Sequence, residues 1–60
     1  MFARVEKPDG TLGPIESADV SERPEIGDDI ALADGRRVQV VGYALDEDGH
    51  LSYLVVAEAQ

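Results

Sequence analysis

The chain has 60 residues and no cysteine, and its 13 Asp and Glu against five Lys and Arg give a net charge of −8 at pH 7. One small domain of this length buries only about 60% of its unfolded surface, and it has neither disulfides nor a thiolate metal cluster to stabilise it. The excess of acid excludes direct nucleic-acid binding, because affinity for phosphate backbones comes from Lys and Arg displacing counterions.

No stretch approaches the ~18 apolar residues of a membrane span, and the N-terminal MFARVEKPDG lacks the apolar region of a signal peptide. We therefore expect a cytoplasmic protein without membrane association. Self-repulsion that maintains solubility, or adaptation to high salt, accounts for the acidity as a general property. The alternative is an acidic face that attracts a basic partner.

The motif x-Asp-Gly occurs three times, at residues 8–10, 33–35 and 47–49, each time between stretches of β-type pattern. It is typical of a hairpin loop whose glycine takes a positive φ. The loops predict strands at residues 1–7, 11–16, 28–33, 36–45 and 50–58. Residues 1–60 are therefore predicted to form one domain, with an N-terminal hairpin at 1–16, a loop at 17–27 and a three-stranded meander at 28–58.

Three-residue loops give the most favourable cross-strand pairs, because most apolar residues then face apolar residues, as Ile30 faces Val38 and Leu45 faces Leu51. The expected pairs are Lys7 with Thr11, Leu32 with Arg36, Ile30 with Val38, Asp28 with Val40, Leu45 with Leu51, Tyr43 with Tyr53, and Val41 with Val55.

Strand 36–45 changes its apolar face along its length. Val38 and Val40 lie on one face, whereas Val41 and Tyr43 lie on the other, with Gly42 just after the change of phase. A bulge or an interior glycine produces such a bend. The last strand, apolar at residues 53–56, is expected to be central and buried on both sides. Together the strands predict an all-β fold, a small, five-stranded, partly open SH3-like barrel.

The segment RPEIGDDIALADGRRVQVVGYALDEDGHLSYLVV, residues 23–56, resembles the SH3-like small barrels of the KOW and Tudor type. In these barrels a Gly-Asp opens a strand and a tight Asp-Gly hairpin leads into a long bent strand. The resemblance implies binding of proteins or nucleic acids rather than catalysis. It implies no binding residues, because a Tudor-like aromatic cage would have only Phe2, Tyr43 and Tyr53, and the surface is acidic where KOW-like RNA contacts are basic.

The stretch DEDGH, residues 46–50, is the most acidic in the chain. As a calcium loop beginning at Asp46 it has its glycine at position 4 instead of 6, and Ala57 rather than Glu at position 12. His50 is the only histidine, so no histidine cluster can bind zinc or iron. The stretch therefore predicts a hairpin turn, with a weak cation site as the open alternative. No metal, cofactor or catalytic residue is assigned.

A non-catalytic interaction or regulatory module is the function that these features favour, binding a protein partner through a sheet edge or an apolar patch. The alternative is an acidic mimic of nucleic acid that inhibits a DNA- or RNA-binding protein. A homodimer is also expected, through the edge at residues 1–7 or 50–58. The candidate partner-binding residues are Asp28, Asp29, Tyr43, Asp46, Glu47, Asp48 and Tyr53.

Overall fold

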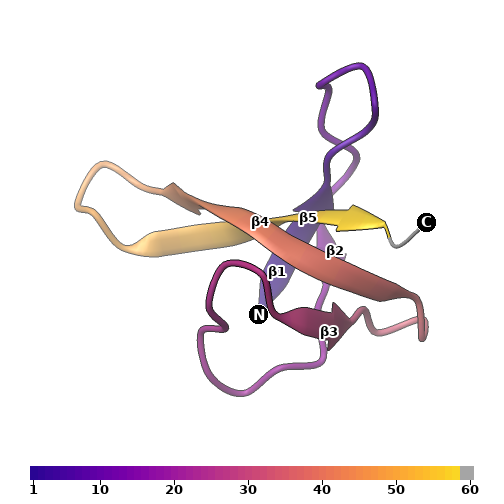
Figure 1. The fold of residues 1–60 in the computed structure, drawn as a ribbon. Coiled ribbons are helices and arrows are strands. Elements are labelled where there is room, and N and C mark those ends of the chain that lie inside the picture. Colours follow the sequence, from indigo (N-terminus) through magenta and orange to yellow (C-terminus); the bar gives the residue numbers. More distant parts are fainter. Residues whose placement is uncertain (59–60) are drawn as a thin grey trace.

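The computed structural model describes residues 1–58 (Figure 1), which form five strands and no helix. The strands are β1 (Phe2–Val5), β2 (Glu16–Ser17), β3 (Asp29–Ala31), β4 (Arg37–Leu45) and β5 (Leu51–Glu58). They form one curled sheet in the order β2-β1-β5-β4-β3. The predicted fold, a small all-β domain with five strands in a partly open barrel, is confirmed. Within this part of the chain there is no helix long and apolar enough to cross a membrane.

The two edges of the curled sheet meet at a single bridge. Ala18, just after β2, pairs with Leu32, just after β3. Beside this pair, the N–H of Asp19 donates a hydrogen bond of 2.9 Å to the carbonyl oxygen of Ala31. The bridge joins the first and last strands of the sheet order, so part of each outer edge is covered.

The core consists of small and medium aliphatic side chains on the concave side of the sheet. Alternation along β4 and β5 directs Val38, Val40, Leu54 and Val56 inward, and all four are fully buried. Among residues 1–58, the buried apolar residues are Ala3, Ala18, Ile30, Leu32, Val38, Val40, Leu54 and Val56.

The three predicted turns are confirmed, since Gly10, Gly35 and Gly49 have φ values of 87°, 93° and 84°. In the first turn, the N–H of Lys7 donates to the carbonyl oxygen of Thr11 at 2.8 Å, as the three-residue loop requires. A side chain at any of the three glycines would meet no atom within 4 Å, so the positive φ alone explains why glycine is favoured there.

The register around the second turn is also confirmed. Ile30 pairs with Val38. The N–H of Leu32 donates to the carbonyl oxygen of Arg36 at 2.9 Å, and the N–H of Val40 donates to the carbonyl oxygen of Asp28 at 2.9 Å.

The predicted register around the third turn is correct beside the turn and wrong at the two pairs farther from it. Leu45 pairs with Leu51 as expected, but Tyr43 pairs with Leu54 instead of Tyr53. The predicted pair of Val41 with Val55 is also wrong, because Val55 pairs with Gly42.

Two compensating bulges are the physical reason for these errors. Ser52 is an extra residue in β5, which shifts the pairing by one position, and Val41 is an extra residue in β4, which restores it. The bulge at Val41 agrees with the predicted change of apolar face.

The N-terminal hairpin differs from the expected one. The predicted strand 11–16 is reduced to a bridge between Glu6 and Leu12, followed by β2 at Glu16–Ser17. Pro14 has no N–H for a ladder, and the side chain of Arg4 fills the gap by donating from Nε to the carbonyl oxygen of Gly13 at 2.6 Å.

Strand β1 also pairs in parallel with β5, with Ala3 opposite Leu54 and Val5 opposite Val56. This pairing confirms that the last strand is central. It also shows that strands 1–7 and 50–58 do not form the outer edges at which a dimer was expected, because both lie inside the sheet.

Candidate functional site

Strand β3 covers only the first part of β4. It pairs with residues 37–39, and the backbone of Val40 adds two hydrogen bonds, donating to the carbonyl oxygen of Asp28 at 2.9 Å and accepting from the N–H of Gly27 at 2.8 Å. Beyond that point, no backbone hydrogen bond joins residues 41–45 to any part of residues 1–58 outside β5. We call residues 41–45, on the side away from β5, the free edge. It lies on the arm formed by β4 and β5, which projects beyond the other strands in Figure 1.

A tight turn at residues 25–28 directs the chain away from β4 opposite Val40. The N–H of Asp28 donates to the carbonyl oxygen of Glu25 at 3.1 Å, and the Asp28 carboxylate accepts from the N–H of Glu25 at 3.0 Å. Gly27 has a φ of 97°, which permits the reversal. The free edge therefore begins where this turn ends the pairing.

Apolar side chains are exposed along the free edge. Val41 retains 39% of its surface and Leu45 retains 59%, although both are aliphatic residues of β4. Ile26, in the turn beside the end of the pairing, is 61% exposed. A strand whose outer edge is unpaired and whose aliphatic side chains are exposed is a template for pairing with another chain.

The predicted acidic residues lie at the two ends of the free edge. Asp28 and Asp29 precede it, at the start of β3, and Asp46, Glu47 and Asp48 follow it in the turn to β5; all five are exposed. Asp46 lies six positions beyond Val40, which is opposite Asp28, so the two groups lie about 20 Å apart along an extended strand. The fold thus places five of the seven candidate residues at the ends of one strand segment, and a sixth, Tyr43, lies within it.

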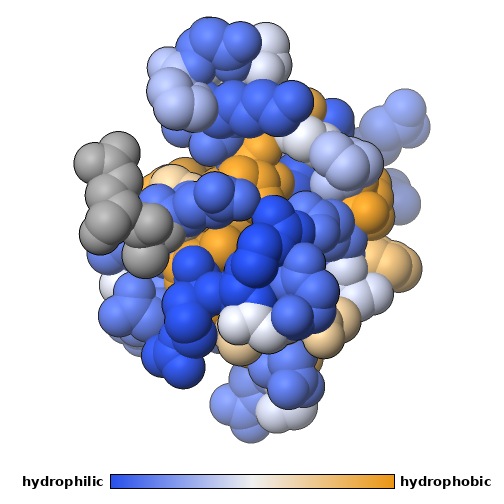
Figure 2. Space-filling view, turned by 90° about the vertical axis from the view of Figure 1, so that its right-hand side faces the viewer, coloured by the Kyte–Doolittle hydropathy of each residue, from blue (hydrophilic) through white to orange (hydrophobic). Residues whose placement is uncertain are grey.

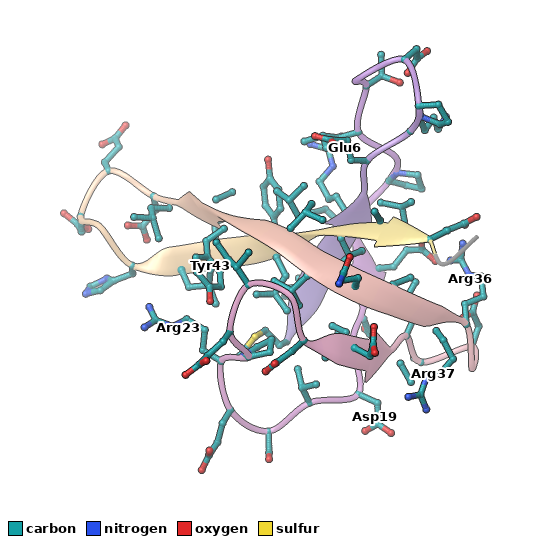
Figure 3. All side chains as sticks on the ribbon, in the orientation of Figure 1. Glu6, Asp19, Arg23, Arg36, Arg37 and Tyr43 are labelled. Atoms are coloured by element: carbon teal, nitrogen blue, oxygen red, sulfur yellow. The ribbon has the colours of Figure 1, made fainter. Side chains whose placement is uncertain are left out.

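Tyr43 is engaged within the protein rather than free for a partner. Its hydroxyl donates to the carbonyl oxygen of Pro24 at 2.6 Å, and the Arg23 guanidinium carbon lies 5.3 Å from the centre of its ring (Figure 3). Its ring also packs against the core. Tyr43 therefore anchors the loop 17–27 to β4.

Tyr53 lies on the opposite face of the sheet from Tyr43. It pairs with Ala44, which neighbours Tyr43 in β4 and so points the other way. The Arg4 guanidinium carbon lies 5.5 Å from the centre of its ring. The two tyrosines are not part of one surface.

The turn at residues 46–50 brings Asp46, Asp48 and His50 together. Each offers one ligand atom, and these atoms lie within 4.8 Å of one another. The Asp46 Oδ1 accepts hydrogen bonds of 2.9 Å from the N–H groups of both Asp48 and His50, which organise the turn. Three exposed ligands are fewer than the six to eight oxygens that Ca²⁺ takes, so the geometry is that of a hairpin turn.

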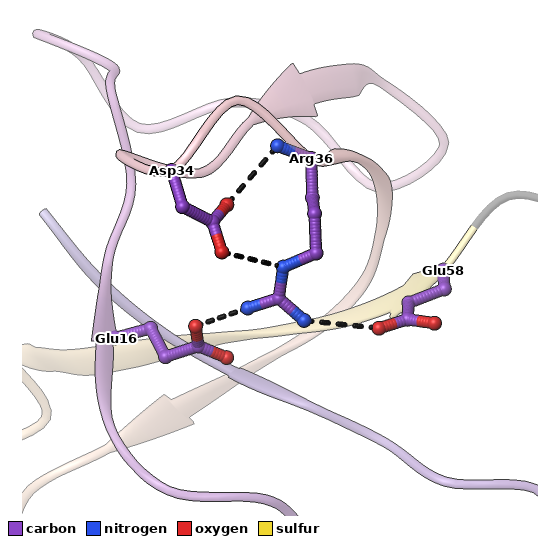
Figure 4. Close-up of polar contacts among 4 residues, drawn as sticks. All are labelled: Glu16, Asp34, Arg36 and Glu58. Carbon is purple, nitrogen blue, oxygen red and sulfur yellow. Dashed lines mark hydrogen bonds and ion pairs between the residues drawn. The ribbon is translucent and has the colours of Figure 1, made fainter.

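An ion-pair cluster surrounds Arg36 (Figure 4), and it was not predicted from the sequence. The Arg36 guanidinium pairs with Glu16, with Asp34 at 2.8 Å and with Glu58 at 3.0 Å. These hydrogen bonds, above all the one to Glu16, raise the pKa of Arg36. The pKa of Asp34 is lowered, first by the N–H of Arg36 and then by its guanidinium. The cluster links β2, the second turn and the end of β5.

Replacing Arg36 with Met should lower the melting temperature at pH 7, because Glu16, Asp34 and Glu58 then face one another without a cation. The lowered pKa of Asp34 stabilises the fold above its ordinary pKa of 3.8, and this contribution is lost as the pH falls through the folded value. The difference from the wild type should therefore shrink below about pH 4. Thermal unfolding, followed by circular dichroism, measures this difference between about pH 2.5 and 7, the range over which carboxylates titrate.

Arg37→Met is the matched control, since it removes a neighbouring arginine that forms no ion pair among residues 1–58. A deficit in Arg36→Met that is equally large at acidic and neutral pH would contradict the ion-pair explanation.

A cleft of about 660 Å³ lies between the N-terminal hairpin and the end of β5. Figure 2 faces this end of the molecule and shows apolar surface beneath the hairpin. The cleft contains the cation Arg36 together with two of its carboxylates, so its charge is largely compensated. Its lining residues are Val5, Glu6, Lys7, Pro8, Gly10, Gly13, Pro14, Glu16, Arg36, Ala57 and Glu58.

No protein-family model, curated protein or solved structure matches this chain. The resemblance to KOW and Tudor barrels therefore stays a prediction. The fold and the free edge are the observations from which a function can be argued.

Proposed function

We propose that this protein is a non-catalytic interaction module that receives a β-strand of a protein partner at the free edge. The observation that carries the proposal is that the backbone of residues 41–45 pairs only with β5. A strand added there would gain main-chain hydrogen bonds in continuation of β3, which is the mode of β-augmentation.

The side chains around the free edge support the same proposal. Val41 and Leu45 offer apolar contacts to an added strand, and the acidic residues at both ends attract basic groups. The proposal includes a cytoplasmic location, in keeping with a small domain that contains no cysteine and so gains no disulfide from an oxidising compartment.

A mimic of nucleic acid would need its carboxylates in rows on one face, at spacings comparable to those of phosphates. Here Glu16, Asp34 and Glu58 surround Arg36 (Figure 4), whereas the acidic turn at residues 46–48 lies at the tip of the β4–β5 arm. This distribution favours strand binding over mimicry.

The substitution Leu45→Lys tests the proposal, because a lysine on an exposed edge opposes strand addition. Ile15→Lys is the matched control, since Ile15 is 51% exposed, close to the 59% of Leu45, and lies outside the free edge. Native lysate is passed over tagged wild type and both variants, and the captured proteins are identified by mass spectrometry. We expect one protein to be captured by the wild type and by Ile15→Lys but not by Leu45→Lys. Equal capture by Leu45→Lys and the wild type would overturn the proposal.

A further inference from the structure

The charges at the two ends of the free edge specify the chemistry of the strand that binds there. We infer that the partner strand carries Lys or Arg at both ends, about six residues apart, with a short stretch of alternating apolar residues between them. This inference rests on the proposed function and adds the class of partner to it.

The length of the free edge sets the spacing of the basic residues. Pairing with β3 ends at Val40, and the turn begins at Asp46. An added strand of about six residues spans that distance at about 3.3 Å per residue. Its ends then lie beside Asp28 and Asp29 on one side and beside the turn at residues 46–48 on the other.

The charge along the free edge is strongly acidic. Five carboxylates stand at its ends, and the basic residue beside it, Arg23, is stacked on the ring of Tyr43. Arg36 and Arg37 lie at the opposite end of the molecule from the β4–β5 turn (Figure 3). Exposed ion pairs are individually weak, so the complementary charge should act mainly on the association rate and on the choice of partner.

The same charges oppose a second copy of this chain as the occupant. In a two-fold dimer the edges of β4 would run antiparallel. That arrangement places the acidic turn at residues 46–48 of one copy beside Asp28 and Asp29 of the other. Like charges opposite one another are destabilising, so the free edge favours a basic strand from a different protein.

Three synthetic peptides test the inference against the full chain. The first has alternating threonine and valine between two lysines at each end, the second has glutamates in place of the lysines, and the third is the lysine peptide with a proline in its centre. Titration into isotope-labelled protein at low salt is followed by amide chemical shifts. We expect the lysine peptide to shift the amides of residues 41–45. The other two peptides should bind at least roughly tenfold more weakly.

Two double variants of equal charge separate a local effect from the effect of net charge. Glu47→Gln with Asp48→Asn removes two charges beside the free edge, whereas Glu6→Gln with Asp19→Asn removes two charges elsewhere (Figure 3). We expect the first pair to slow association of the lysine peptide several-fold more than the second pair, and added salt to reduce this difference.

The outcomes distinguish the inference from the proposed function. If the lysine and glutamate peptides shift the amides of residues 41–45 with equal affinity, strand addition stands and the basic partner is overturned. Equal weakening by the two double variants would also overturn it. If no peptide shifts these amides, the inference fails, and strand capture in the Leu45→Lys experiment then decides the proposed function separately. If sedimentation shows a dimer and dilution shifts the amides of the β4 edge, then a second copy of this chain, rather than a basic strand, binds at the free edge.

Discussion

Replacing Leu54 with Ala should unfold a large part of the protein at 25 °C. Leu54 has no exposed surface and lies in the central strand, where it pairs with Ala3 of β1 and Tyr43 of β4. Truncating a buried leucine costs about 2–5 kcal/mol. A chain of this length has a total unfolding free energy of only about 3–9 kcal/mol. Urea denaturation followed by circular dichroism measures the loss.

Leu45→Ala is the control for this substitution, because Leu45 is the same residue type but largely exposed. Its effect should be below about 1 kcal/mol. Equal unfolding midpoints for Leu54→Ala and Leu45→Ala would mean that the core is not where the structure places it.

Tyr43→Ala should have the second largest effect on stability, a loss of about 2 kcal/mol. A fully buried ring would cost more, about 3–5 kcal/mol. The change removes the ring from the edge of the core, from its stacking with Arg23 and from its hydrogen bond to Pro24. The loop 17–27 then loses its anchor, so its amides should exchange faster with solvent. Chemical denaturation and hydrogen exchange test the two parts of this prediction.

Tyr43→Phe divides the effect between ring and hydroxyl. It keeps the packing and loses the hydrogen bond to Pro24, which contributes about 0.5–1.5 kcal/mol. If Tyr43→Phe and Tyr43→Ala were equally destabilised, the ring would contribute nothing, and the anchoring role described above would be wrong.

The local features of the fold could be predicted because short stretches of sequence determine them. Gly10, Gly35 and Gly49 follow aspartates in turns that need a positive φ. From the second of these turns, alternation alone was enough to predict the pairing of β3 with β4.

The errors arose where distant parts of the chain decide the structure. The extra residues Ser52 and Val41 compensate one another, so the expected pairing around the third turn looked uninterrupted. The parallel pairing of Ala3 with Leu54 joins segments from opposite ends of the chain. No local pattern indicates such a pairing, because the apolar residues of a strand do not specify whether its neighbour runs parallel or antiparallel to it.

The candidate site was predicted only in part, because contacts between distant parts of the chain also determine it. Five exposed acidic residues at 28–29 and 46–48 were visible as charges, and they lie at the ends of the free edge. The edge itself depends on where β3 begins, which the turn at Gly27 determines. Arg36 was expected only to decorate a hairpin, and its partners Glu16 and Glu58 are about 20 positions away in each direction.

The parallel contact between β1 and β5 also has a consequence for how the chain folds. Strand β5 lies between β1 and β4, so the N-terminal third of the chain cannot join the sheet until residues 51–58 have been synthesised. Contacts of such wide sequence separation slow folding, because the entropy of closing the loop is lost before the contacts form. On the ribosome, the nascent chain should therefore stay without stable structure until its last strand emerges, and then fold as one cooperative unit.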